Sequence, residues 1–141
     1  MSETERPVLA DLRVLVVDDD QDTCELLHMV LTSRGAEVTT VDSAGAALNA
    51  FNLVRFDVLL SDAGLPDVTG WSLIETIRRM TPENGGRIPA VAVTGYAYPG
   101  DVARSLASGF DAHLSKPVEI DLVVETIARL LGRSGTRTSG A

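Results

Sequence analysis

Cysteine, lysine and net positive charge are scarce in this chain of 141 residues. The shortage of cysteine argues against disulfides, and the lack of positive charge argues against some classes of binding partner. The single cysteine, Cys24, cannot form an internal disulfide, and its place in a helical pattern favours a buried thiol without chemistry. The net charge of -8 argues against general binding to nucleic acid or to an anionic membrane. No apolar run approaches the ~20 residues of a membrane span, and residues 1–10 lack the apolar stretch of a signal peptide, so we expect a cytoplasmic protein.

The length and composition predict a single globular domain. Hydrophobic residues make up 45% of the chain and charged residues 23%, which is an ordinary balance for a protein with a proper core. Residues 1–10 are polar, and residues 133–141 are rich in Gly, Ser and Thr. We therefore expect an N-terminal tail (1–10), a domain (11–132) and a flexible C-terminal tail (133–141).

Strand-like and helix-like patterns alternate five times between the tails. The expected strands lie near residues 12–17, 37–41, 58–60, 90–94 and 112–114. An amphipathic helical pattern follows each of them. Strict alternation with short loops predicts parallel strands joined by right-handed helical crossovers, hence an α/β three-layer sandwich of the flavodoxin-like kind. A closed eight-unit barrel needs about 250 residues, so an open sheet remains. Its expected strand order, 2-1-3-4-5, is adopted from known five-stranded sheets of this type.

The organising feature of the sequence is Asp62, which follows an apolar, strand-like run at residues 58–60. Ligands bind at the carboxyl edge of open α/β sheets. In the order 2-1-3-4-5 the first and third strands are neighbours, so Asp18 and Asp19, which follow the first strand, should meet Asp62 at one crevice. Three carboxylates within ~5 Å repel by roughly 3 kcal/mol per pair at an effective dielectric near 20. A hard divalent cation offsets this best, so the cluster predicts Mg²⁺. Asp20 is instead predicted to cap the N-terminus of the helix that follows.

Two other expected strands end on residues suited to a phosphoryl group. Thr94 is followed by Gly95, which leaves open space beside the hydroxyl, and Lys116 directly precedes Pro117. Lys116 is the only lysine in the chain, beside eleven arginines. A compact ammonium acts as a point charge on a phosphoryl oxygen where a guanidinium fork would not fit. Alone, either residue is more often a plain strand end or surface charge. The position of Thr94 and Lys116 at neighbouring strand ends favours a role in binding a phosphoryl group.

Four motifs resemble those of receiver domains of two-component response regulators, in order and spacing, over roughly residues 11–132: VLVVDDD, LLSDAGLPDVTGW, AVTG and HLSKP. The resemblance implies that Asp62 is the phosphoacceptor. It also implies that Asp18 and Asp19 hold Mg²⁺ together with Asp62 and the backbone carbonyl of Gly64. A partner histidine kinase or histidine phosphotransfer protein would donate the phosphoryl group, and a downstream protein would receive the signal.

The same resemblance assigns the switch. Thr94 and Lys116 would bind the phosphoryl group, His113 would take the aromatic switch position, and the bond before Pro117 would be cis. Phosphorylation is then expected to draw Thr94 inward and let His113 turn in behind it. The face formed by the fourth helix, fifth strand and fifth helix would change. A homodimer through this face is one expected assembly.

Three departures from the family pattern bear on the lifetime and the switch rather than on phosphorylation. Gly64 and Tyr96 replace polar side chains that many members carry two residues after the acceptor and the switch hydroxyl. His113 replaces the usual Tyr or Phe. Because hydrolysis needs a water held in line with the acyl phosphate, we expect a comparatively long-lived phosphorylated state.

Two alternatives stay open at this point. Asp18-x-Asp20 with Thr23 resembles the nucleophile motif of haloacid-dehalogenase-type phosphatases, which would make Asp18 the acceptor. That family needs a second acidic pair after its lysine, and only Glu119, Asp121 and Glu125 follow here. The other alternative is a receiver that acts as a docking surface without phosphorylation. On the favoured interpretation the protein is not an enzyme beyond assisting its own phosphorylation and dephosphorylation, and it binds neither nucleic acid nor membrane.

Overall fold

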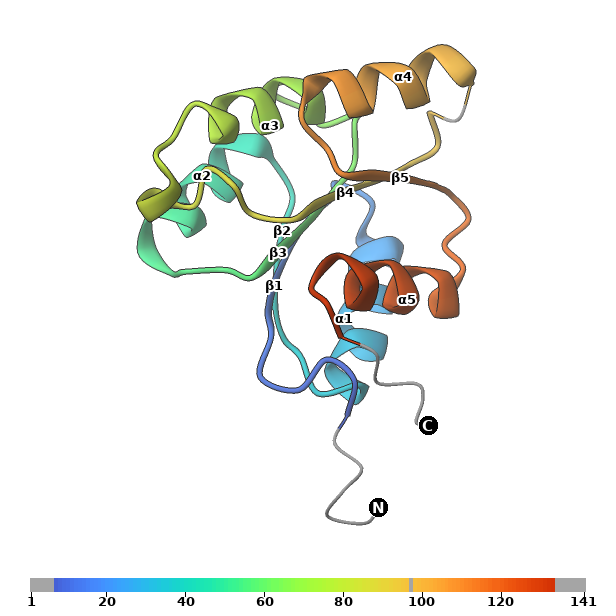
Figure 1. The fold of residues 1–141 in the computed structure, drawn as a ribbon. Helices are drawn as coiled ribbons and strands as arrows, with labels where there is room; N and C mark the ends of the chain where they lie inside the picture. The colour runs from blue at the N-terminus through green and yellow to red at the C-terminus, as the bar shows by residue number, and fades with distance from the viewer. Residues whose placement is uncertain (1–6, 97, 134–141) are drawn as a thin grey trace.

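A five-stranded parallel sheet forms the centre of the computed structural model, which describes residues 7–96 and 98–133 (Figure 1). The strands are β1 (Arg13–Val17), β2 (Glu37–Val41), β3 (Val58–Ser61), β4 (Ala90–Thr94) and β5 (Ala112–Ser115). Their order is β2-β1-β3-β4-β5, and every pair of neighbours is parallel. This confirms the predicted α/β fold and its order 2-1-3-4-5.

Helices cover both faces of the sheet. They are α1 (Gln21–Ser33), α2 (Ala44–Leu53), α3 (Gly70–Arg78), α4 (Pro99–Ser108) and α5 (Ile120–Leu130), with a 3₁₀ turn, η1 (Pro82–Asn84), before β4. α1 and α5 lie on one face, and α2, α3 and α4 lie on the other (Figure 1). Within residues 7–96 and 98–133, no helix has the length and apolar character needed to cross a bilayer.

The central strands are apolar without alternation because both of their faces are covered. In β1, Val14 and Val16 pack into the core beneath α1 and α5, whereas Leu15 packs on the opposite side, in the core that contains α3. β3 divides in the same way, with Leu60 in the first core and Leu59 in the second. Two apolar cores thus hold the sheet between its helical layers, and the strand ends remain free to carry polar groups.

The N-terminal segment belongs to the packed domain. Leu9 is 0% exposed within the core of α1 and α5, and its backbone N–H donates to the Arg34 carbonyl at 3.0 Å. From the other end of the chain, Arg133 Nη1 donates to the Ala10 carbonyl at 2.8 Å. Leu9 and Ala10 therefore pack against the domain, within the segment expected as an N-terminal tail. Residues 1–6 and 134–141 of the two expected tails lie outside the described residues.

Asp67 ties the loop between β3 and α3 to the start of α2. Its two carboxylate oxygens accept hydrogen bonds from the backbone N–H groups of Ala44 at 3.0 Å and Gly45 at 2.9 Å, and Oδ1 also accepts from Val68 at 2.9 Å. These N–H groups, Gly45 first, hold the pKa of Asp67 below its usual value. The loop that carries Asp62 is therefore fastened by a charged cap at a helix N-terminus.

We expect Asp67→Asn to lower the urea midpoint of unfolding at pH 7 and to matter much less at pH 3. A carboxylate whose folded pKa is depressed contributes stability above its unfolded pKa, ~3.9, and loses it as the pH falls through the folded value. The matched control is Glu75→Gln, which removes one charge from an exposed site on α3. An equal loss at both pH values would contradict the role of the ionised cap.

Candidate functional site

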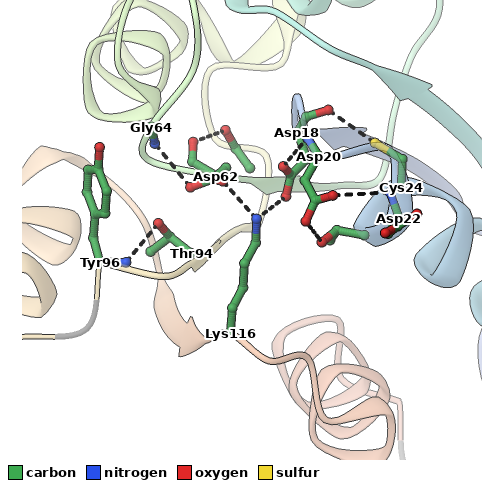
Figure 2. Close-up of polar contacts among 11 residues, drawn as sticks. Asp18, Asp20, Asp22, Cys24, Asp62, Gly64, Thr94, Tyr96 and Lys116 are labelled. Atoms are coloured by element: carbon green, nitrogen blue, oxygen red, sulfur yellow. Dashed lines mark hydrogen bonds and ion pairs between the residues drawn. The ribbon is translucent and has the colours of Figure 1, made fainter.

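The carboxyl ends of four strands bring the predicted residues to one crevice (Figure 2). Asp18, Asp62 and Lys116 each directly follow a strand, and the backbone N–H of each donates to the last residue of the neighbouring strand. Asp62 N–H donates to the Val17 carbonyl at 2.9 Å, and Lys116 N–H donates to the Thr94 carbonyl at 2.9 Å. Asp18 is fastened in the same manner to the end of β2. The backbone ladder, extended one residue beyond the strands, thus aims these side chains at a common point.

Lys116 is the counter-charge of two buried carboxylates. Its Nζ lies 2.9 Å from Asp18 Oδ2 and 2.9 Å from Asp62 Oδ2, as Figure 2 shows. Burial by itself lowers the pKa of Lys116, but its hydrogen bonds to Asp62 and Asp18 and their charges outweigh burial and raise it. The ammonium is therefore charged at neutral pH. It stands where an anionic group bound to Asp62 would need compensation.

Asp62 is buried yet ionised. Burial is the largest influence and raises its pKa, but the Thr94 hydroxyl, the Gly64 N–H and the Lys116 ammonium together outweigh it. The Gly64 N–H donates to Asp62 Oδ1 at 3.0 Å. The net result is a pKa below the usual value for an aspartate, so the carboxylate presents anionic oxygens at neutral pH. That is the state a nucleophile requires.

Asp18 has the opposite balance. Burial raises its pKa, and the nearby charge of Asp62 adds to the rise. The Asp20 N–H, which donates to Asp18 Oδ1 at 2.9 Å, and the Lys116 ammonium offset only part of it. The buried thiol of Cys24 donates to the Asp18 carbonyl at 3.2 Å, and burial raises its pKa to about 11. The thiol of Cys24 is therefore protonated at neutral pH.

Asp18, Asp19 and Asp62 can offer one carboxylate oxygen each, with these atoms all within 4.8 Å of one another. Asp18 and Asp62 are buried and Asp19 is exposed, so the cluster opens to solvent on one side. An all-oxygen set with an open side suits Mg²⁺, which retains waters and joins carboxylates to phosphoryl oxygens. The donor set thus fits the metal that the sequence predicts.

Asp20 and Thr23 serve the start of α1 instead of the crevice. Asp20 accepts a hydrogen bond from the Thr23 hydroxyl at 2.8 Å and another from the Asp22 N–H at 3.2 Å. The Thr23 hydroxyl is the largest influence that lowers the pKa of Asp20. Asp20 and Thr23, two of the three residues on which the phosphatase alternative relied, are therefore engaged as a helix cap.

Tyr96 and Gly64 meet at the edge of the crevice. Tyr96 N–H donates to Thr94 Oγ1 at 3.2 Å, and the Tyr96 ring lies alongside Gly64 (Figure 2). A Cβ added at Gly64 would lie 2.8 Å from the Tyr96 hydroxyl oxygen, so the two positions share one space. Among residues 7–96 and 98–133, no atom lies within 4 Å of a Cβ added at Gly95.

His113 lies in a polar contact that the sequence analysis missed. Its Nδ1 is 2.8 Å from the hydroxyl of Ser105, which also accepts a hydrogen bond from the Trp71 indole at 2.9 Å. No motif marks Ser105, because a serine within an amphipathic helix carries no signal of its own.

The peptide bond between Lys116 and Pro117 is cis.

Comparison with known proteins agrees with this geometry. The family described as response regulator receiver domain matches residues 14–128. The chain is 40% identical over 111 residues to an uncharacterized 14.6 kDa protein of Leptolyngbya boryana, across 79% of this chain and 83% of that protein. A crystal structure of a CheY-like response regulator receiver domain protein from Methanospirillum hungatei is 32% identical, with a TM-score of 0.79, and the match covers 87% of this chain and 95% of that one.

Similarity also extends to parts of much larger proteins. The sensor histidine kinase RcsC of Salmonella typhimurium is 36% identical over 118 residues, which are 84% of this chain but 12% of the kinase. The chain thus spans a small fraction of that relative. The family match to residues 14–128, the parallel sheet and the acidic crevice with Lys116 agree with one another. The chain belongs to the response regulator receiver domain family and is a phosphoacceptor signalling domain rather than an enzyme.

Proposed function

We propose that Asp62 accepts a phosphoryl group from a phosphohistidine of a partner kinase or phosphotransfer protein. A carboxylate oxygen of Asp62 forms the new O–P bond as the N–P bond of the phosphohistidine breaks, and the histidine imidazole leaves. The observation that carries the proposal is the contact of Asp62 Oδ2 with Lys116 Nζ at 2.9 Å. It puts an ionised nucleophile and a cation for the transferred group at the same point.

On this proposal Lys116 and Thr94 bind the phosphoryl oxygens. Lys116 supplies a point charge already directed at Asp62, and the Thr94 hydroxyl contributes to the hydrogen bonding of the same carboxylate. Both positions are set by the backbone before any ligand arrives, so they cost little reorganisation when charge develops on the phosphoryl group. Bound Mg²⁺ would neutralise further charge on the transferred group.

The test of this function is incubation with acetyl phosphate and Mg²⁺, followed by intact-mass measurement. One phosphoryl group should be added per chain, and EDTA should prevent the addition. Peptide mapping should locate the group on Asp62. No addition to the folded protein under any of these conditions would favour the alternative of a receiver that docks without phosphorylation.

We also propose that Mg²⁺ is held by Asp18, Asp19, Asp62 and the Gly64 carbonyl. Asp19→Ala should weaken Mg²⁺ binding at least tenfold, since it removes one oxygen ligand and one negative charge from the cluster. Calorimetric titration of the unphosphorylated protein measures this. Asp22→Ala is the matched control, because it removes an exposed acid of α1 outside the cluster. Equal binding by Asp19→Ala and wild type would exclude Asp19 as a ligand.

We propose that the face formed by α4, β5 and α5 is the surface that binds a downstream protein. Large side chains are exposed there, with Tyr98 80% exposed, Leu106 49% and Leu122 39%. Such residues provide the apolar anchors that a protein partner uses. A downstream target, or a second copy of this chain, would bind this face, which His113 on β5 adjoins.

Gly64 and Tyr96 should make the phosphorylated state long-lived. Gly64 has no side chain to hold a water in line with the acyl phosphate, and Tyr96 lies over that position. We expect Gly64→Asn and Tyr96→Glu each to speed phosphoryl loss by several-fold, because each supplies a polar group that can position water. The half-life of the acid-stable mass adduct measures this.

The control for Tyr96→Glu is Tyr98→Glu, the same substitution two residues further on at a site that is 80% exposed. It should leave the half-life at the wild-type value. Unchanged half-lives in both Gly64→Asn and Tyr96→Glu would show that water positioning at these two sites does not limit the lifetime.

A further inference from the structure

A buried serine hydroxyl joins three elements beside the candidate site. Ser105 Oγ, on α4, accepts a hydrogen bond from the Trp71 indole Nε1 of α3 at 2.9 Å. It also lies 2.8 Å from Nδ1 of His113 on β5. Ser105 is 0% exposed and Trp71 6% exposed, so water does not compete for these contacts. α3 and α4 lie side by side over this end of the sheet (Figure 1), and the hydroxyl links both to β5.

The ring of His113 depends on that hydroxyl. Its second nitrogen, Nε2, is buried and has no hydrogen-bond partner among residues 7–96 and 98–133. A buried polar atom without a partner disfavours the orientation that buries it. The contact with Ser105 therefore offsets a penalty, and without it the ring would gain by turning its nitrogens toward water.

The chemistry of the three groups limits where the protons lie. Indole Nε1 is only a donor, so Ser105 Oγ is the acceptor in that bond. The serine can then donate its own proton to a bare Nδ1 of His113, or accept one from a protonated Nδ1. The first arrangement leaves a buried N–H on Nε2, and the second uses the serine oxygen twice as an acceptor, so that its own proton needs another acceptor. In either arrangement the contact ties His113 to one tautomer, and we expect a single tautomer to dominate.

The same tryptophan reaches the candidate site from its other side. The Tyr96 ring lies 5.8 Å from the Trp71 ring, centroid to centroid, at an interplanar angle of 48°. Tyr96 N–H in turn donates to the Thr94 hydroxyl at 3.2 Å. The guanidinium carbon of Arg104, on α4, lies 4.1 Å from the Trp71 ring centroid, a cation–π contact that adds a second hold on α4. Contacts thus run continuously from Thr94 to the serine.

We propose that Ser105 is a positioning residue whose hydroxyl fixes the ring of His113 and, through Trp71, couples the Asp62 pocket to α4 and β5. The contact between Ser105 and His113 is a property of the unphosphorylated protein and does not depend on the proposed function. The coupling rests on the proposed function of Asp62. His113 can then turn only when its contact with Ser105 breaks, so its orientation does not follow from phosphorylation alone.

The test compares Ser105→Ala with Ser108→Ala, the same change on the same helix at a residue outside this network. Imidazole ¹⁵N resonances report the tautomer of His113, and the indole N–H resonance and emission spectrum report the only tryptophan. Wild type and Ser108→Ala should show one dominant tautomer. Ser105→Ala should show averaged tautomers and a shifted indole N–H. Unchanged His113 and Trp71 signals in Ser105→Ala would overturn the hold on the ring.

The coupling is tested by titration with beryllofluoride and Mg²⁺, a mimic of the phosphoryl group on an aspartate. Because the contact stabilises the unphosphorylated arrangement, Ser105→Ala should bind the mimic roughly fivefold more tightly than wild type, within the usual range of coupling between sites. Ser108→Ala should bind as wild type does. Equal affinity in Ser105→Ala and wild type would overturn the coupling. Failure of wild type itself to bind the mimic would count against the function of Asp62, and the ring signals would still decide the hold on His113.

Should Ser105→Ala not fold, Trp71→Phe provides the second variant. It removes the indole donor but keeps an aromatic ring, so the Ser105 hydroxyl loses one of its two partners. The tautomer balance of His113 should then change, because the serine oxygen is free to reorient. A His113 spectrum identical to that of wild type in Trp71→Phe would overturn the link through Trp71.

Discussion

Asp62→Asn should reduce phosphoryl incorporation from acetyl phosphate by more than about a hundredfold, whereas Asp18→Asn should still be labelled on Asp62, only more slowly. The asparagine amide has nearly the shape of the carboxylate but lacks the anionic oxygen that attacks phosphorus. Asp62 is also the carboxylate with the depressed pKa, while that of Asp18 is raised. Intact-mass time courses with Mg²⁺ measure both variants.

The pair of variants separates the competing mechanisms because each removes one charge from a buried carboxylate that contacts Lys116. Loss of Asp18 costs a metal ligand but leaves the nucleophile in place. Unabated labelling of Asp62→Asn, together with loss of labelling in Asp18→Asn, would restore the reading in which Asp18 is the acceptor. Circular dichroism of both proteins shows whether the fold is retained.

Arg78→Met should lower the free energy of unfolding by about 3 kcal/mol. Arg78, at the end of α3, donates to the carbonyls of Gly109 at 2.9 Å, Gly86 at 3.0 Å and Ile88 at 2.7 Å. It also pairs with Asp111 at 3.1 Å. One guanidinium thus fastens the end of α3 to the loop before β4 and to the turn between α4 and β5.

Methionine keeps most of the aliphatic stem but supplies no donor, so three carbonyls lose a charged partner at once. Hydrogen bonds to charged groups are each worth about 1.5–3 kcal/mol, and partial access of water to these turns offsets part of the sum. Arg79→Met is the matched control, because Arg79 is the exposed neighbour and its loss should change stability by no more than about 0.5 kcal/mol. Urea unfolding of the three proteins measures the effect, and equal midpoints for Arg78→Met and wild type would contradict it.

The alternation of apolar strands and amphipathic helices was sufficient to predict the layers of this fold. Both patterns are local, because a strand covered on both faces is apolar throughout and a helix on a sheet is apolar on one side. The strand order came from known sheets of this type, since nothing in a local pattern states which strands are neighbours. The start of α1 was also predictable, because Asp20 caps it as expected.

The gathering of Asp18, Asp62, Thr94 and Lys116 was predictable because parallel strands present their carboxyl ends at one edge. A residue just after such a strand has its direction set by the backbone, whatever its side chain. The sequence thereby determined which residues share the crevice. The donation by Lys116 to both carboxylates, and the opposite directions in which the two pKa values move, were decided by burial and by the hydrogen bonds around each group.

Contacts between helices and loops were decided only by the tertiary structure. The buried anchor Leu9, the fastening of three segments by Arg78, the shared space of Tyr96 and Gly64, and the hydroxyl of Ser105 all join residues far apart in the chain. The pattern around each is that of an ordinary loop or helix. Such contacts depend on how whole elements pack, at a precision of about one ångström, and periodicity along the chain carries no information at that scale.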